Sequence, residues 1–397
     1  MIRVVAGTYE GLLYGWECPI VAKGKKTTMK LTFGYAAHSE CIKSVALMEA
    51  KQGKTLLSGG SDEMIKIYNV DKRVEIGSLM EQHGAITSIE FFGQSHVLSG
   101  SADNSICIWR TSEWNCLHIL GGHKGEINAI AVHPSGKMCF SVARDRTLRM
   151  WNLVKGRIAF IRRLEKEAEL VMISKKGTHY ALGFGRELSV FNMNAELLGT
   201  LEHAKKIYCA AFATNDFIVC GGDDKVIYIW KINGTLVGKI TSSDIDARIR
   251  CLEVVYPHGE DKLPWIVLAT SNGTFQIWDF ASFVLDESSP EESNKPVEPI
   301  ASIGLLTKPR VTCLSAAIGS NSTCADDEDE ILNQNIKKPR KVKKATGTAR
   351  AAGVPHVVVE MDGESDSTAR DDTPKKRKPG ARKQQQSRHK KIKQSNS

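Results

Sequence analysis

The chain has 397 residues, 42% of them hydrophobic, and a formal net charge of +9 at pH 7. This composition supplies enough apolar side chains for a packed core and excludes a chain that is disordered throughout. Because no apolar stretch is long enough to span a membrane and the N-terminus lacks the apolar run of a signal peptide, we expect a soluble intracellular protein without a membrane partner.

The first patterned stretch is Val4–Trp16, a small-residue run, an acidic residue, a short turn and apolar residues that end in an aromatic side chain. The pattern returns at intervals of 39 to 52 residues. Its final aromatics are Trp16, Tyr68, Trp109, Trp151, Phe191, Trp230 and Trp278. A period near 40 with one strand–turn–strand signature per unit is typical of a β-propeller. The sequence therefore predicts an all-β, seven-bladed propeller over residues 1–318.

The chain opens in the middle of a repeat, because Glu10 stands six residues before Trp16 as Asp103 stands six before Trp109. The strands missing from this repeat must come from elsewhere, and Pro299–Ala317 contains suitable apolar segments. Pairing N- and C-terminal strands in one sheet would leave no free edge at the seam. We therefore expect the seventh blade to be a composite of both ends of the propeller.

Four repeats begin with a histidine that precedes the aspartate of the same repeat by 20 to 24 residues. Within a blade, this histidine can reach the aspartate, a hydroxyl from Ser58, Ser99 or Ser141, and the blade-end aromatic. Such a set resembles a hydrolytic triad, but one protein does not need several equivalent active sites, and buried polar groups must be paired. We interpret the pairs as a structural network: His38 with Asp62, His83 with Asp103, His123 with Asp145, and His203 with Asp224.

Two blades depart from the pattern. The fourth, Ala168–Asn192, has Gly185 at the aspartate position and no histidine at its head. The sixth has Asn272 at that position and a longer loop within Glu253–Trp265. The insertion Asp286–Pro299 is acidic and rich in Pro and Ser, so we expect it to be solvated.

Beyond the propeller the composition changes. Residues 319–397 hold 18 Lys and Arg against 11 Asp and Glu, which leaves 36 against 34 in the first 318 residues. Such a segment cannot offset its ordering entropy, so we expect a disordered tail. Its basic runs fit both a nuclear import receptor and RNA phosphates, two compatible roles that we expect together, and a merely solvated tail is the alternative. The two clusters are Lys337, Lys338, Arg340, Lys341, Lys343 and Lys344, and Lys375, Lys376, Arg377, Lys378, Arg382 and Lys383.

No metal or cofactor signature occurs in the sequence. The ten cysteines form no C-x-x-C pair, and there is no H-E-x-x-H, EF-hand, P-loop or G-x-G-x-x-G pattern. Several cysteines, among them Cys107, Cys139 and Cys209, lie in apolar runs, as reduced thiols do. No candidate nucleophile has a base of its own, so we expect a protein that is not an enzyme and that needs no cofactor.

The repeats resemble WD40 repeats, because their strands end in W-R, W-N, W-K and W-D. Three further segments resemble the p21-activated protein kinase-interacting protein family: V-A-G-T-Y-E at Val5, H-K-G-E-I at His123, and T-L-R-M-W-N-L-V-K-G-R-I-A-F-I at Thr147. That family is nucleolar, takes part in assembly of the large ribosomal subunit, and is also described as a negative regulator of p21-activated kinase. The resemblance implies a nuclear and nucleolar scaffold in rRNA processing, with ribosome-assembly and ribosomal proteins and pre-ribosomal RNA as partners. The alternative that it implies is a protein that binds the regulatory region of the kinase.

Overall fold

The computed structural model describes residues 1–21, 25–242, 245–259, 262–284 and 298–319. The chain divides into two units, Met1–Ala325 and Asp326–Ser397, and the described residues all belong to the first. The two basic clusters of the predicted tail and most of the predicted acidic insertion lie outside the described residues.

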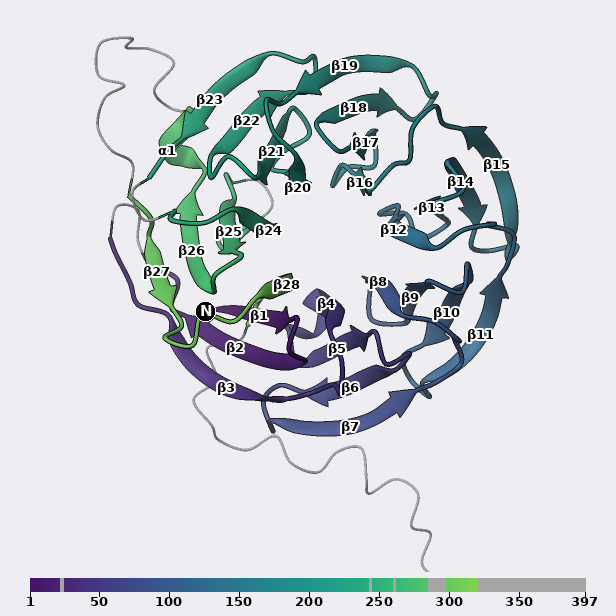
Figure 1. The fold of residues 1–397 in the computed structure, drawn as a ribbon, viewed down its shortest axis with the longest axis horizontal. Coiled ribbons are helices and arrows are strands. Elements are labelled where there is room, and N and C mark those ends of the chain that lie inside the picture. Colours follow the sequence, from purple (N-terminus) through teal and green to yellow (C-terminus); the bar gives the residue numbers. More distant parts are fainter. Residues whose placement is uncertain (22–24, 243–244, 260–261, 285–297, 320–397) are drawn as a thin grey trace, which may run out of the picture. The chain divides into compact units, whose positions relative to one another are not determined.

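Seven four-stranded antiparallel sheets form a closed ring, which confirms the predicted propeller (Figure 1). In each sheet the strands follow one another from the central channel to the rim. Blade 1 consists of β4 (Ile42–Leu47), β5 (Thr55–Gly60), β6 (Ile65–Asn69) and β7 (Val74–Leu79). Blade 2 consists of β8 (Ile86–Phe92), β9 (His96–Ser101), β10 (Ile106–Arg110) and β11 (Asn115–Leu120). Blade 3 consists of β12 (Ile127–Val132), β13 (Met138–Ala143), β14 (Thr147–Asn152) and β15 (Arg157–Arg163).

The other half of the ring repeats this order. Blade 4 consists of β16 (Leu170–Ile173), β17 (His179–Phe184), β18 (Glu187–Asn192) and β19 (Leu197–Glu202). Blade 5 consists of β20 (Ile207–Phe212), β21 (Phe217–Gly222), β22 (Ile227–Lys231) and β23 (Leu236–Ile240). Blade 6 consists of β24 (Ile249–Val255), β25 (Trp265–Thr270), β26 (Thr274–Asp279) and β27 (Ala301–Gly304), and blade 7 of β28 (Val311–Ile318), β1 (Ile2–Thr8), β2 (Leu12–Cys18) and β3 (Lys30–Ala36). Two short helices, η1 (Glu49–Lys51) and α1 (Ala281–Val284), lie in loops.

Blade 7 closes the ring with strands from both ends of the unit. Strand β28 pairs antiparallel with β1, from Ile2 opposite Ile318 to Thr8 opposite Val311, and Gly319 N donates a hydrogen bond to Met1 O at 2.9 Å. The predicted composite blade is therefore confirmed. The segment Pro299–Ala317 is divided differently from the prediction, because its first strand, β27, completes blade 6 and only β28 belongs to blade 7. The free edge of β26 pairs with β27, which completes the four-stranded sheet of blade 6 before the chain continues to β28.

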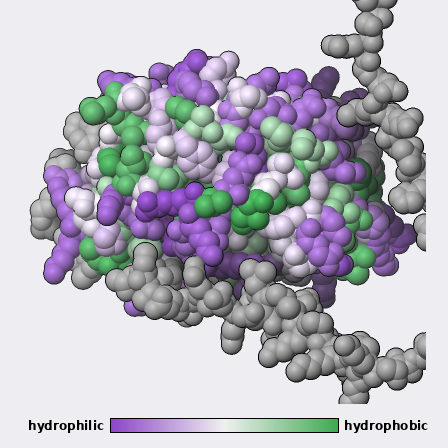
Figure 2. Space-filling model, turned by 90° about the horizontal axis from the view of Figure 1, so that it is seen from below, coloured by the Kyte–Doolittle hydropathy of each residue, from purple (hydrophilic) through white to green (hydrophobic). Residues whose placement is uncertain are grey.

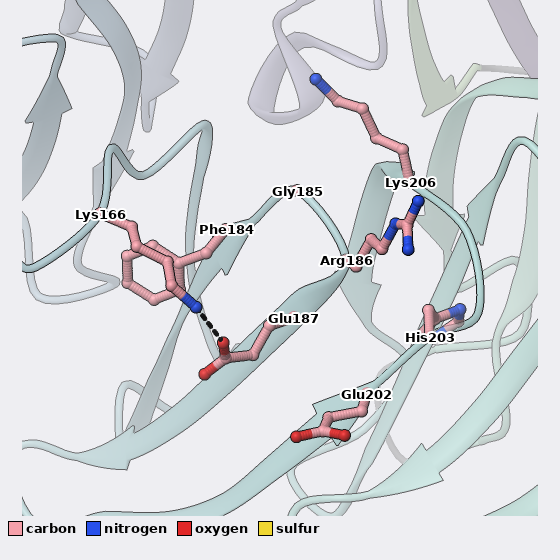
Figure 3. A pocket seen from close by; sticks show the side chains of 8 residues that line it. All are labelled: Lys166, Phe184, Gly185, Arg186, Glu187, Glu202, His203 and Lys206. Atoms are coloured by element: carbon pink, nitrogen blue, oxygen red, sulfur yellow. Dashed lines mark hydrogen bonds and ion pairs between the residues drawn. The ribbon is translucent and has the colours of Figure 1, made fainter.

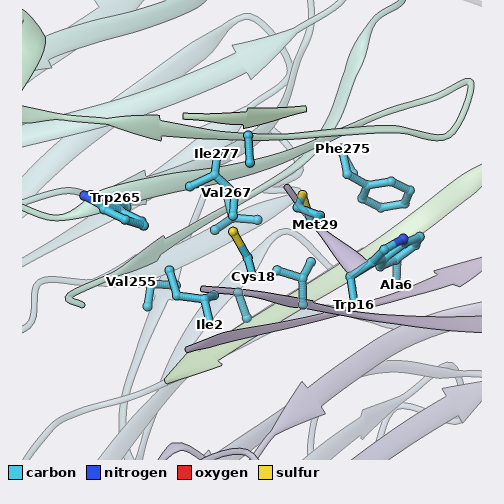
Figure 4. Close-up of a cluster of buried hydrophobic side chains, with 14 of the residues drawn as sticks. Ile2, Ala6, Trp16, Cys18, Met29, Val255, Trp265, Val267, Phe275 and Ile277 are labelled. Atoms are coloured by element: carbon cyan, nitrogen blue, oxygen red, sulfur yellow. The ribbon is translucent and has the colours of Figure 1, made fainter. Parts of the chain in front are cut away.

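Apolar side chains fill the space between neighbouring blades. All seven blade-end aromatics are buried, at 0 to 9% exposure. At the seam, Trp16 of blade 7 lies against Phe275 of blade 6, with ring centroids 4.1 Å apart, and Ile2 and Val267 belong to the same cluster (Figure 4). The seam is thus held by side-chain packing as well as by the β1–β28 ladder.

The outer strands of the ring expose polar and apolar side chains together. Figure 2 shows the side of the ring with separate apolar patches on a largely hydrophilic surface. Exposed apolar side chains include Leu31 of β3 and Val74 and Ile76 of β7. Scattered apolar side chains of this kind do not form a large apolar interface. Among the described residues, no helix is long and apolar enough to cross a membrane.

Candidate functional site

Blade 3 holds the most complete polar network. His123 Nδ1 lies 2.9 Å from Asp145 Oδ2, and His123 Nε2 lies 2.7 Å from Ser141 Oγ. The indole of Trp151 donates to the same Ser141 Oγ at 2.8 Å. This geometry arises because the histidine precedes the inner strand, the serine lies on the second strand, and the aspartate occupies the turn between the second and third strands. The hydroxyl is fully buried and has both partners, so it is part of the packing.

Hydrogen bonds stabilise the ionised carboxylate of Asp145 in this network. Burial by itself raises the pKa of Asp145, but hydrogen bonds from Thr147, from the Lys124 N–H and from His123 lower it to about 2. Burial lowers the pKa of His123, and Asp145 opposes this shift. The aspartate is therefore ionised at neutral pH, and it orients the imidazole.

Blade 1 repeats the arrangement with a tyrosine at the blade end. His38 Nδ1 lies 2.9 Å from Asp62 Oδ1, and His38 Nε2 lies 2.6 Å from Ser58 Oγ. The aromatic of this blade, Tyr68, is buried and packs edge-on against Tyr35 of blade 7, with centroids 5.6 Å apart.

In blade 2 the structure corrects the prediction for His83. Its side chain is exposed, and only its backbone N–H reaches Asp103, at 2.8 Å from Oδ2. The buried position is taken by Gln82, whose Oε1 accepts a hydrogen bond from Ser99 Oγ, and Trp109 Nε1 also donates to that hydroxyl. The reason is spacing: Gln82 stands four residues before the inner strand, as His123 does in blade 3.

Blade 5 also differs from the prediction. His203 Nε2 accepts a hydrogen bond from Trp230 Nε1 at 3.1 Å and lies 3.1 Å from Cys220 Sγ, and within the described residues no hydrogen bond joins it to Asp224. Cys220 occupies the position that serine has in blades 1 to 3. A cysteine beside a histidine can be a nucleophile, but burial raises the pKa of the Cys220 thiol, so the thiolate is disfavoured.

Blade 4 lacks the network, because Leu182 stands where blades 1 to 3 have serine and no histidine precedes its inner strand, and its turn is also shorter. Gly183 pairs with Leu188, five residues on, whereas Gly59 of blade 1 pairs with Ile65, six residues on. The shortened turn holds Gly185 at φ +71°, a conformation that glycine adopts without strain. A cavity of about 660 Å³ lies beside this turn (Figure 3). Its lining mixes both charges: Lys166, Phe184, Gly185, Arg186, Glu187, Glu202, His203 and Lys206.

Blades 6 and 7 arrange their polar groups differently, and Trp16 Nε1 of blade 7 has no hydrogen-bond partner among the described residues. Asn272 Oδ1 accepts from Thr270 Oγ1, and Trp278 Nε1 donates to Gln276 Oε1 at 3.2 Å. Glu10 of blade 7 pairs with Arg310 at 3.2 Å. Among the described residues, no group of three or more His, Cys, Asp or Glu side chains is arranged to hold a metal ion.

The two mouths of the central channel carry charged side chains. The mouth at which the inner strands end has a cavity of about 630 Å³, lined by Glu90, Glu253 and Lys175 among others. Burial raises the pKa of Glu90 and of Glu253 to about 8, although each accepts a backbone hydrogen bond. The mouth at which the inner strands begin has a cavity of about 390 Å³, lined by Glu126, Arg144 and six further residues.

The seven-bladed ring, with buried aromatic blade ends and a histidine–serine–aspartate network in blades 1 and 3, defines a WD-repeat β-propeller. The WD40 family (WD domain, G-beta repeat) matches residues 74–110, 114–152 and 195–231. Each match begins on the outer strand of one blade, or on the turn before it, and ends in the third strand of the next.

The chain belongs to the p21-activated protein kinase-interacting protein 1-like family of WD-repeat proteins. It is 33% identical over 279 residues to the protein of that name from Danio rerio, and the aligned residues cover 70% of this chain and 73% of the relative. It is 31% identical over 350 residues to the one from Gallus gallus, covering 86% and 89%. It is 26% identical over 337 residues to Shk1 kinase-binding protein 15 of Schizosaccharomyces pombe, covering 83% and 89%.

Proposed function

We propose that this chain is a non-catalytic scaffold in the assembly of the large ribosomal subunit and in rRNA processing, and that it works in the nucleolus. The observation that carries this proposal is the division of charge between a nearly neutral propeller and a basic segment after residue 318. Such a segment neutralises RNA phosphates whatever their sequence. The compact run Lys375–Lys378 also fits a nuclear import receptor.

The propeller supports a binding role. The Ser58, Ser99 and Ser141 hydroxyls are occupied by partners inside their blades, so the blades use these groups for packing. Loops on a rigid ring are suited to recognition. In this proposal the ring docks on ribosome-assembly and ribosomal proteins, while the basic segment contacts pre-ribosomal RNA.

The structure fixes where the tail can be removed to test this proposal. The Gly319 N–H donates to Met1 O, so a truncated chain must keep residue 319. A full-length variant with the twelve clustered Lys and Arg residues changed to Gln is the matched control for length. Both proteins should leave the nucleolus and lose most of their cross-linking to RNA. Nucleolar localisation that is unchanged in both would overturn the proposal.

A second candidate function is regulation of a p21-activated kinase through its regulatory region. It is favoured by the relatives, whose names describe interaction with p21-activated protein kinase and binding to Shk1 kinase. Depletion of the protein separates the two candidates. Accumulation of large-subunit rRNA precursors with unchanged kinase activity supports the assembly role, and raised kinase activity with normal precursors supports the kinase role.

A further inference from the structure

Six of the seven inner strands contain a β-bulge at the same place, directly after their first residue. A bulged residue is left out of the ladder, and bulges commonly redirect a side chain. All six therefore lie at the mouth where the inner strands begin. The bulged residues are Lys43, Thr87, Asn128, Tyr208, Arg250 and Thr312.

Blades 5, 6, 7 and 1 bring a group of cations to this mouth. Lys206, Arg248 and Arg310 each stand one residue before an inner strand, next to the bulges. Three cations surround the half-buried ring of Tyr208: Arg250 Cζ lies 5.2 Å from its centroid, Lys206 Nζ 5.7 Å and Arg248 Cζ 5.8 Å. The term basic arc is used here for five cations: Lys43, Lys206, Arg248, Arg250 and Arg310.

Among the described residues, part of this charge has no ion-pair partner. Lys206 pairs with Glu169 at 2.7 Å, and Arg310 pairs with Glu10. For Lys43, Arg248 and Arg250, no carboxylate of the described residues lies within 4.0 Å. Lys43 and Arg248 are exposed, so both can meet a ligand.

Blades 3 and 4 bring carboxylates to the same mouth, and these are ion-paired. Glu126 and Glu167 share Arg144, at 3.0 and 3.9 Å, and Glu169 holds Lys206. These groups line the cavity of about 390 Å³. Within the described ranges, the mouth therefore presents three cations without an ion-pair partner on one side and three ion-paired carboxylates on the other.

We propose that the basic arc binds an extended segment of a partner protein that carries clustered carboxylates. Guanidinium groups pair with carboxylates through charge-assisted hydrogen bonds. RNA carries a negative charge at every residue, so a strand laid across the mouth would meet Glu126, Glu167 and Glu169. A peptide can place its acidic residues on one side only, and it therefore fits both sides. The inference rests on the proposed scaffold function and assigns its docking surface.

The test is fluorescence anisotropy on the purified full-length chain with two labelled probes, hexaglutamate and a twelve-nucleotide oligouridine. The variant is Arg248→Gln with Arg250→Gln, and the control is Lys72→Gln with Arg73→Gln, two exposed cations on the outer turn of blade 1. Every protein retains the tail, so differences between variants report on the mouth. We expect hexaglutamate to bind about tenfold more weakly to the variant and oligouridine to bind equally well.

Equal hexaglutamate binding by the variant and the wild-type chain would overturn the proposal. A comparable loss of oligouridine affinity would also overturn it and would identify the mouth as an RNA site. If the double variant does not fold, the single variants Lys43→Gln and Arg248→Gln, both at exposed positions, replace it in the same measurement. Failure here removes the docking surface only, since the assembly role is judged separately by rRNA processing in cells.

Discussion

Replacing Asp145 by asparagine tests whether the blade networks stabilise the ring. Asp145 Oδ2 accepts from the Lys124 N–H at 3.0 Å and lies against His123, while Oδ1 accepts from Thr147 N and Oγ1 at 3.0 and 2.7 Å. An amide keeps the shape but turns one acceptor into a donor, so two of these four hydrogen bonds are lost. At about 1–1.5 kcal/mol each, the expected loss is about 2–3 kcal/mol.

The pKa of Asp145, which reflects the same hydrogen bonds, gives a similar order of magnitude. It is lowered from 3.8 to about 2, so ionised Asp145 stabilises the fold by about 2 kcal/mol at neutral pH. Because the folded pKa lies below the unfolded one, this stabilisation is complete above pH 4 and is lost as the pH falls through 2. The penalty of Asp145→Asn should therefore shrink by about 1 kcal/mol between pH 7 and pH 3.

The measurement is urea unfolding of the full chain at both pH values, followed by tryptophan fluorescence. Asp223→Asn, at an exposed aspartate, is the control and should cost less than about 0.5 kcal/mol. A penalty of Asp145→Asn that is the same at pH 3 and pH 7 would refute the argument that the ionised carboxylate organises the blade.

Three further outcomes follow from the geometry. Gln82→Ala should cost about 1–3 kcal/mol in urea unfolding, because it removes the acceptor of the Ser99 hydroxyl proton and leaves only the hydrogen bond from Trp109. The exposed His83→Ala should cost less than about 0.5 kcal/mol, and equal costs would contradict the assignment of blade 2. A chain that ends before β28 should lose its cooperative thermal transition, because β1 and the seam cluster are uncovered, and one that ends at Gly319 should keep the wild-type Tm. Glu253→Gln should raise the Tm at pH 8.5 and change it little at pH 5. The reason is that the pKa of Glu253 is raised in the fold, so the free energy of unfolding falls as the pH rises from 4.5 to 8. An equal change in Tm at both pH values would show that this carboxyl is ionised in the fold.

The propeller could be predicted from the sequence because its repeat signals are local. The spacing from aspartate to blade-end aromatic identifies strands that lie next to each other, and the half repeat at Val4–Trp16 already requires a partner from the other end of the unit. The sequence could not predict that Pro299–Ala317 contributes one strand to blade 6 and one to blade 7. Whether β27 pairs with β26 depends on which strand edge lies next to it in the folded ring.

The site residues were predictable only where residue type and spacing agree. His38 and His123 have both the expected type and the four-residue spacing to the inner strand. In blade 2 the type pointed to His83 while the spacing pointed to Gln82, and spacing decides because only that position faces Ser99. The basic arc has no signal along the chain, since Lys43 and Arg250 are brought to one mouth by bulges in blades far apart in sequence.

The change in the free energy of unfolding on removing a charged residue distinguishes residues that stabilise the ring from residues available for binding. Asp145 and His123 are paired, and removing either partner leaves the other buried without its hydrogen bond. Arg248 and Arg250 contact the ring of Tyr208, and such cation–π contacts contribute about 0.5–1 kcal/mol at exposed sites. The repulsion between these cations and Lys206 opposes that gain. Their change to glutamine should therefore alter the free energy of unfolding by less than about 1 kcal/mol, whereas removal of a residue that the fold requires lowers it by more. Positive charge that the fold does not need and that lies at the mouth of a rigid ring is what a docking surface for carboxylates requires.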